Sequence, residues 1–197
     1  MTMISRMMGG YVRSSRRLTL LLILVLAACD DPFGPAVWDA TPDTMLLYSA
    51  SRAEYLGFPS ALDITSVPVQ PVPLEAPSVT GNWDLALLDN AGGLALAPSG
   101  AFAGLESRAR IAVLANRTLD SVTQASRDTT TYTADPVQIE LGNVYVVRSR
   151  RASCGISSGY RYAKLRPVEI NVAAGTYRFE IVRNPYCDNR SFIPPEE

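Results

Sequence analysis

The chain has 197 residues, with 18 lysines and arginines against 19 aspartates and glutamates, and it contains no histidine. The lack of histidine excludes the Ser/His/Asp and Cys/His nucleophile systems and removes the commonest zinc ligand. We therefore expect a protein that is not an enzyme and holds no metal ion.

The N-terminal segment has the three zones of an export signal. Arg13, Arg16 and Arg17 precede an apolar run over residues 18–28, and no acidic residue occurs before Asp30. An apolar helix of about eleven residues is only about 16 Å long, whereas the hydrocarbon core of a bilayer is about 30 Å thick. The pattern predicts a cleaved signal peptide over residues 1–28.

The end of this segment, Leu26-Ala27-Ala28-Cys29, resembles the bacterial lipobox. The resemblance implies that Cys29 is acylated and that the mature protein is a lipoprotein of the cell envelope, held in the outer membrane or at the periplasmic face of the inner membrane. Asp30 resembles the inner-membrane retention signal of enteric bacteria, a rule that fails in other lineages, so both membranes stay open. The alternative is an ordinary secretory signal with Cys29 as a chance thiol.

The cysteine count supports the lipid interpretation. Three cysteines are an odd number for an exported protein, and an odd cysteine needs an explanation. Lipidation of Cys29 leaves Cys154 and Cys187 as a pair, which we predict forms a disulfide in the oxidising envelope.

Charge is distributed unevenly along the chain. Removal of residues 1–28 takes away four arginines and leaves 14 basic against 19 acidic residues, so no nucleic-acid partner is indicated. Residues 148–190 hold nine basic and three acidic side chains. This basic part is suited to an anionic ligand or a membrane surface. The alternative is that these arginines simply cover solvated strand faces.

Residues 29–40 are predicted to be a polar, turn-rich tether, and residues 41–197 a single β-rich domain. Short apolar or alternating runs separated by Gly, Pro, Asn and Asp indicate an all-β fold, mainly antiparallel and sandwich-like, with few short helices. The proline-rich stretch 67–77 is predicted to be an edge crossing or loop. Strands are expected at 44–50, 61–66, 83–88, 109–114, 121–125, 130–133, 137–141, 144–150, 161–170 and 176–182.

The last third of the chain is predicted to be an antiparallel meander. Tyr177, Phe179 and Ile181 alternate with Arg178 and Glu180, which is the pattern of a half-buried strand. A loop containing glycines 155 and 159 is expected between the first two strands, and the predicted disulfide would clip this loop to the C-terminal tail.

Three segments in order resemble one family, the HmuY-like envelope lipoproteins. They are Gly81-Asn82-Trp83-Asp84-Leu85-Ala86-Leu87, the run Asn143-Val144-Tyr145-Val146-Val147-Arg148, and Tyr162-Ala163-Lys164-Leu165 with Gly175-Thr176-Tyr177-Arg178-Phe179-Glu180. The resemblance implies a largely β fold and the capture of haem. Members of the family bind haem through histidines or methionines, and this chain has no histidine and only Met45 after cleavage. Since tyrosine also serves as an axial ligand, the remaining candidates are Met45, Tyr132, Tyr145, Tyr160 and Tyr162.

Three functions compete at this point. The first is capture of haem or another small hydrophobic or anionic ligand, and the second is a structural or interaction role in the envelope. The third is an enzyme that uses a carboxylate pair such as Asp84 and Asp89. A plain structural interpretation makes Trp83 a core aromatic, Asp84 a hydrogen-bond acceptor at a sheet end and Lys164 a residue on a solvated strand face. A pocket lined by Met45 or tyrosines would favour capture, and a filled sandwich would favour the interaction role.

Overall fold

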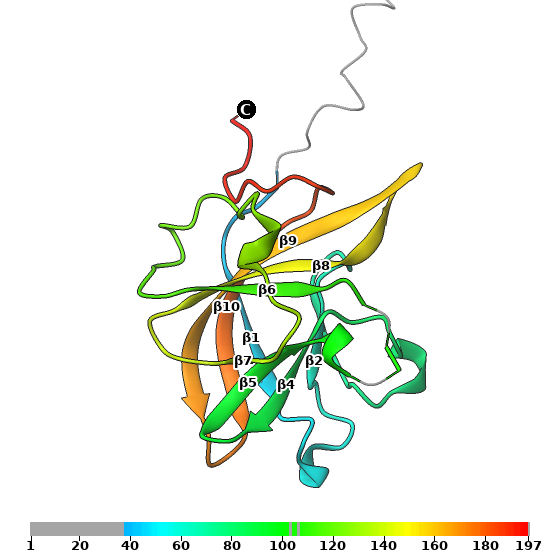
Figure 1. Ribbon diagram of the computed structural model, residues 1–197, viewed down its shortest axis with the longest axis vertical. Helices are drawn as coiled ribbons and strands as arrows, with labels where there is room; N and C mark the ends of the chain where they lie inside the picture. The colour runs from blue at the N-terminus through cyan, green and yellow to red at the C-terminus, as the bar shows by residue number, and fades with distance from the viewer. Residues whose placement is uncertain (1–37, 103, 106, 197) are drawn as a thin grey trace, which may run out of the picture. The chain divides into compact units, whose positions relative to one another are not determined.

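The computed structural model describes residues 38–196, apart from residues 103 and 106. The predicted signal peptide, Cys29 and most of the tether lie outside the described residues. Over the described part, the chain forms two antiparallel five-stranded sheets and only short 3-10 helices (Figure 1). The predicted all-β, mainly antiparallel fold is confirmed. Trp38, 9% exposed, already packs in a hydrophobic cluster, so the folded domain includes residues that were assigned to the tether.

The first sheet contains the predicted meander. Its strand order is β1 (Asp43–Tyr48), β10 (Thr176–Asn184), β9 (Ser157–Asn171), β8 (Val144–Cys154) and β6 (Arg110–Leu114). In β10 the alternation has its expected result, because Tyr177, Phe179 and Ile181 are buried while Arg178 is exposed.

The second sheet has the order β3 (Gln70–Val72), β2 (Ala61–Asp63), β4 (Leu85–Asn90), β5 (Gly93–Pro98) and β7 (Val137–Gln138). Strand β5 was not predicted. All six of its residues are buried, so its sequence lacks the polar alternation that marks a half-exposed strand. Strand β3 lies inside the proline-rich stretch that was predicted to be a crossing or loop. Its place at the edge of the sheet is one of the few that tolerates proline.

Two predicted strands are absent among the described residues. Residues 121–125 are irregular, with one isolated bridge at Gln124. Residues 130–133 contain the end of a 3-10 helix, η4 (Thr129–Thr131), and an isolated bridge at Thr133. Asp128 caps this helix by accepting a hydrogen bond from the Thr130 N–H at 2.9 Å. Serine, threonine and aspartate compete for backbone hydrogen bonds in this way and favour turns over strands.

The expected loop between the first two strands of the meander is also wrong. Strands β8 and β9 continue into a long hairpin that pairs Cys154 with Ser157, so only Gly155 and Ile156 form the turn. In Figure 1 this hairpin projects from the sheet toward the end of the domain where the C-terminal tail lies.

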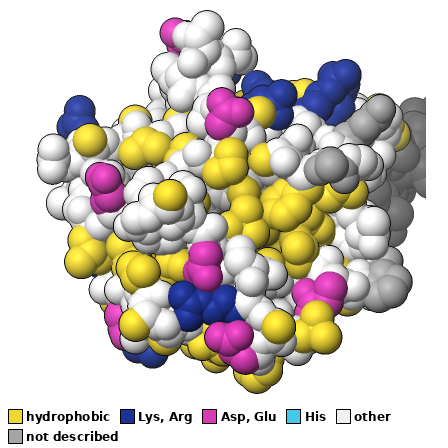
Figure 2. Space-filling view, turned by 60° about the horizontal axis from the view of Figure 1, so that its bottom comes forward, with side chains coloured by type: hydrophobic (Ala, Val, Ile, Leu, Met, Phe, Trp, Pro, Cys, Tyr) yellow, Lys and Arg dark blue, Asp and Glu magenta, His cyan; other side chains and the backbone are white. Residues whose placement is uncertain are grey.

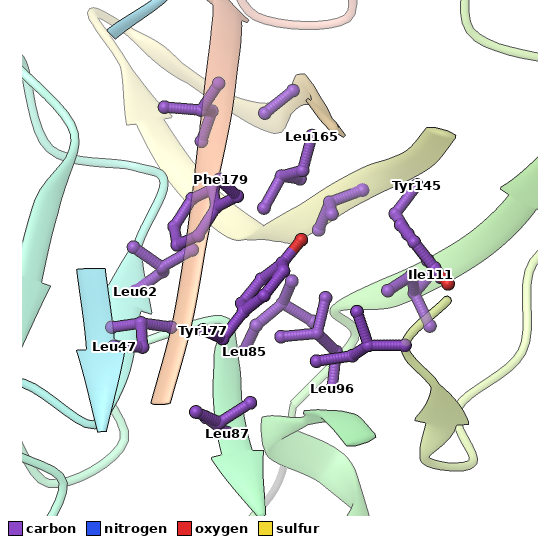
Figure 3. Packing of buried hydrophobic residues seen from close by; sticks show 14 of the residues in the cluster. Leu47, Leu62, Leu85, Leu87, Leu96, Ile111, Tyr145, Leu165, Tyr177 and Phe179 are labelled. Carbon is purple, nitrogen blue, oxygen red and sulfur yellow. The ribbon is translucent and has the colours of Figure 1, made fainter. Parts of the chain in front are cut away.

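Hydrophobic side chains fill the space between the sheets. Figure 3 shows Leu62, Leu85 and Leu96 from one sheet pointing toward Tyr177, Phe179 and Leu165 from the other. The rings of Tyr177 and Phe179 stack with centroids 4.7 Å apart. Two further clusters cover the outer faces of the sheets. The interior is therefore a packed core, and candidate binding surfaces must be sought outside it.

Candidate functional site

Asp84 lies immediately before β4 and is completely buried. Its carboxylate accepts hydrogen bonds from the Ile64 N–H at 2.8 Å, from the Arg150 N–H at 2.6 Å and from Arg150 Nη1 at 3.0 Å. Burial raises the pKa of Asp84 to about 6, although the Arg150 charge acts in the opposite direction. Asp84 is therefore an internal hydrogen-bond acceptor, as its structural interpretation predicted.

The carboxylate pair considered for catalysis does not converge. Asp89, near the other end of β4, accepts a hydrogen bond from Arg52 Nε at 2.8 Å. The carboxylate near Asp84 is instead Asp63, because Arg150 Nη2 lies 3.0 Å from Asp63 Oδ1. Since Asp84 has no exposed surface, no substrate reaches it.

The candidate haem ligands separate into two groups. Tyr145 is fully buried between the sheets, where its hydroxyl donates to the Gln138 carbonyl at 3.0 Å and accepts from the Glu140 N–H at 2.8 Å. Met45 is partly buried against the same core. Tyr145 is therefore closed to an external ligand, and Met45 is only partly exposed. Tyr132, Tyr160 and Tyr162, by contrast, come together on the outer face of the first sheet.

Arginines surround these three tyrosines. The Arg148 guanidinium lies 4.8 Å from the Tyr160 ring centroid and 5.8 Å from that of Tyr132, and Arg151 lies 5.8 Å from Tyr160. Arg190, from the C-terminal tail, acts electrostatically on Tyr132 and Tyr162. We call this set the arginine–tyrosine cluster: Tyr132, Arg148, Arg151, Tyr160, Tyr162 and Arg190.

Two guanidinium groups of the cluster have no acceptor within the described part of the chain. Among the described residues, neither Arg148 nor Arg190 forms an ion pair or donates a side-chain hydrogen bond, and the Nε atom of each is buried without a partner. A buried donor that makes no hydrogen bond costs about 1–3 kcal/mol, and charged donors cost more. The buried Nε atoms are out of reach from the surface, but the Nη atoms of the two arginines are not buried in this way, so an anion at the surface can accept hydrogen bonds from them.

Two tyrosines of the cluster, Tyr132 and Tyr162, are held as neutral phenols. Burial raises the pKa of Tyr132 to about 12 against the opposing effect of Arg148 and Arg190, and burial also raises the pKa of Tyr162. A neutral phenol can donate a hydrogen bond to an anion, whereas it is a poor source of the phenolate that an iron ligand requires. The cluster is thus chemically suited to bind an anion rather than haem iron.

Lys164 does not lie on a solvated strand face, as its structural interpretation proposed. Only 5% of the residue is exposed, and its Nζ donates to the carbonyls of Leu119 at 2.8 Å and Val122 at 3.0 Å. Burial lowers the pKa of this lysine. Lys164 therefore fastens the loop after β6 onto the sheet.

Cys154 and Cys187 lie at disulfide distance, with their Cα atoms 6.1 Å apart. The bond joins the tip of the β8–β9 hairpin to the tail after β10. The same tail is held to β9 by two hydrogen bonds between Tyr160 and Asp188, of 3.0 Å and 2.7 Å. The tail that carries Arg190 is thus fixed beside Arg148 and Tyr160.

Two surface hollows lie outside the cluster. One, of about 340 Å³, is lined by residues that include Trp38, Asp43, Pro68 and Arg183, and the other, of about 490 Å³, is lined in part by Arg166. Within the described chain, neither is lined by Met45 or by a tyrosine. The first combines carboxylates with an arginine, so its charge does not select one sign of ligand.

Hydrophobic side chains gather on the end of the domain opposite the arginine–tyrosine cluster. Figure 2 turns this end toward the viewer. Near the helix η1 (Ala53–Tyr55), the rings of Tyr48 and Phe58 lie 4.9 Å apart, and Leu56 is 75% exposed. This apolar surface is the main feature of the fold that would suit a protein partner.

The arginines of the cluster were not singled out from the sequence, although the signal was present in the basic composition of residues 148–190. The comparisons with known proteins add no assignment: no protein-family model matches the chain, and no curated protein matches it. The described residues contain no group of three or more Asp, Glu or Cys side chains that could hold a metal ion. They also include no helix with the length and apolar character needed to cross a bilayer.

Proposed function

We propose that this chain is a lipid-anchored protein of the cell envelope whose β domain binds an anionic group, without catalysis, at the arginine–tyrosine cluster. The observation that carries the proposal is the pair of guanidinium groups at Arg148 and Arg190, which lack acceptors among the described residues and lie beside neutral phenols. Hydrogen bonds from arginine to phosphate or carboxylate are strong and often bidentate.

The anchor is part of the proposal and rests on the lipobox resemblance at Cys29. Growth with radiolabelled palmitate should label the wild-type protein and place it in the membrane fraction. The Cys29→Ser variant should carry no label. Label retained by that variant would contradict the anchor without bearing on the anion site.

The binding site is tested by calorimetric titration of residues 30–197 with inorganic phosphate and phenyl phosphate. All three hydrophobic clusters are formed by residues 38–192, so this fragment contains its own core. We expect binding by the wild type and its loss in a variant with Arg148→Gln and Arg190→Gln. The matched control is Arg178→Gln, an exposed arginine on β10 whose closest carboxylate atom is 3.6 Å away. Equal binding by both variants would overturn the site.

Capture of haem, implied by the HmuY-like resemblance, receives less support. The raised pKa of Tyr132 and Tyr162 opposes phenolate ligation, and Met45 packs against the core. We expect haem titration to leave the Soret band unshifted. A saturable shift that disappears in Tyr132→Phe or Tyr162→Phe would restore the haem proposal.

A second candidate is interaction with another envelope protein, and the exposed apolar surface around Tyr48, Leu56 and Phe58 favours it. Affinity purification from solubilised membranes should then recover a stoichiometric partner that is lost in Leu56→Ser with Phe58→Ser. Leu141→Ser, at another exposed leucine, is the control. Recovery of no partner would count against this role.

A further inference from the structure

We propose that the end of the domain formed by the β8–β9 hairpin tip and the C-terminal tail docks onto an anionic bilayer, with Ile156 inserted and Arg148, Arg151 and Arg190 facing lipid phosphates. This inference rests on the proposed anion-binding role of the cluster and names lipid phosphate as its ligand.

The hairpin tip presents an isolated apolar side chain. Ile156 is fully exposed, at 109% of the reference area, and follows Gly155, whose φ of +75° allows the tight turn. The strand pairing continues to Cys154 and Ser157, and the disulfide to Cys187 fastens the tip to the tail. The tip is therefore a supported projection, and an apolar residue there gains free energy by leaving water for the bilayer interface.

The charges behind the tip match an anionic surface. Arg151 is exposed on β8, and Arg148 and Arg190 lack carboxylate partners among the described residues. The nearby acidic residue, Asp188, accepts a hydrogen bond from the Tyr160 N–H at 3.0 Å. Basic residues near a membrane containing anionic lipids are each attracted to its surface.

The tether places this end close to the membrane. Trp38 packs in the same hydrophobic cluster as Tyr162 and Phe192. Nine residue steps separate Cys29 from Trp38, which corresponds to at most about 32 Å of extended chain. If Cys29 carries the lipid, the end of the domain that contains Trp38 cannot move far from the bilayer. In Figure 1 the first described residues, the C-terminal tail and the hairpin lie toward this same end.

The test is co-sedimentation of residues 30–197, which carry no lipid, with vesicles of phosphatidylcholine alone or mixed with phosphatidylglycerol. We expect binding only to the mixed vesicles, and weaker binding as salt is raised, because the attraction is screened. Arg148→Gln with Arg190→Gln should weaken binding about 30-fold, and Ile156→Ser about tenfold. Arg178→Gln and Leu141→Ser, which change an exposed arginine and an exposed leucine elsewhere, should bind as the wild type does.

Equal sedimentation with both kinds of vesicle, or binding that does not depend on salt, would overturn the inference. Both results can be obtained with the wild-type fragment alone. Its failure differs from failure of the proposed function. If the fragment binds inorganic phosphate through Arg148 and Arg190 but does not sediment with anionic vesicles, the cluster binds a soluble anion and the docking inference is wrong. If it binds neither, both proposals fall.

Discussion

Arg150 joins the two sheets by holding Asp84 with both its main chain and its side chain. The Arg150 N–H lies 2.6 Å from Oδ1 of Asp84, and Nη1 lies 3.0 Å from Oδ2, although the residues are 66 positions apart in the chain. One residue belongs to β8 and the other precedes β4. A buried charged pair therefore links the two sheets where β4 begins.

The stability of the domain should depend on pH through Asp84. Its pKa is about 6 in the folded protein, whereas an unperturbed aspartate has a pKa of about 3.9. The folded state then binds more protons than the unfolded state between about pH 4 and pH 6, so the free energy of unfolding falls as pH rises through that window, by about 3 kcal/mol at most.

Urea unfolding of the wild type and of Asp84→Asn at several values from pH 4 to pH 7 measures this effect. The Asn variant has no titrating group at position 84, so its stability relative to the wild type should rise with pH over the window. Parallel pH profiles for the two proteins would show that Asp84 titrates normally.

Removal of Arg150, the ion-pair partner of Asp84, should strongly destabilise the domain. Arg150→Met leaves the Asp84 carboxylate buried without its guanidinium, and loss of one member of a buried ion pair costs about 3–5 kcal/mol. Arg178→Met serves as the control, because Arg178 and its partner Glu169 have side chains 50% and 56% exposed, and such pairs contribute about 0–1 kcal/mol. Unfolding in guanidinium chloride at pH 7 distinguishes the Arg150→Met and Arg178→Met variants. Similar costs for both would mean that solvent or other groups compensate for Arg150.

The disulfide should contribute substantially to stability. Cys154 and Cys187 are separated by 33 positions, and closure of a loop of this length is worth about 4 kcal/mol in the chain-entropy model. We expect Cys154→Ser with Cys187→Ser to unfold at markedly lower denaturant concentration. Mass spectrometry with and without reductant provides the covalent check. Two free thiols in the unreduced mature protein would rule out the bond.

Two glycines with positive φ should respond differently to alanine. Gly175 has φ of +64°, and an added Cβ would meet the Arg52 side chain, whereas Gly142 has φ of +85° with nothing within 4 Å of that position. Both substitutions impose left-handed strain of about 1–2 kcal/mol. Gly175→Ala should cost more because it also disturbs Arg52, which donates to the Val172 carbonyl at 2.7 Å. Thermal unfolding measures the stability of the two variants. Equal losses of stability would mean that the Arg52 side chain moves aside freely.

One predictable part of the fold is a strand with one face exposed to solvent. In β10 the alternation of Phe179 with Arg178 and Glu180 records a buried and a solvated face, and the strand was found. Strand β5 is buried on both faces and rich in alanine and leucine, so no periodicity marked it. The two false strands failed for another reason: their polar side chains make local hydrogen bonds, as Asp128 does with Thr130.

The site was less predictable than the fold because it depends on contacts between distant segments. The composition of residues 148–190 indicated an anionic ligand or membrane surface, but it could not separate arginines with partners from those without. Arg150 forms ion pairs with Asp63 and Asp84, and Arg166 with Glu180. Among the described residues, the Arg148 guanidinium forms no ion pair and lies against aromatic rings. The burial of Lys164 was unpredictable for the same reason, because its carbonyl acceptors lie more than 40 residues earlier in the chain.

If the chain is anchored to a membrane as proposed, strand β3 has a further consequence. It forms one edge of its sheet, where a strand from a neighbouring copy would otherwise find free amide donors. Pro71 lies within the strand, and Pro68 and Pro73 flank it, so several of those donors do not exist. Proteins tethered to one membrane meet far more often than proteins in solution. The prolines at this edge would keep such encounters from growing into sheets that run from one molecule to the next.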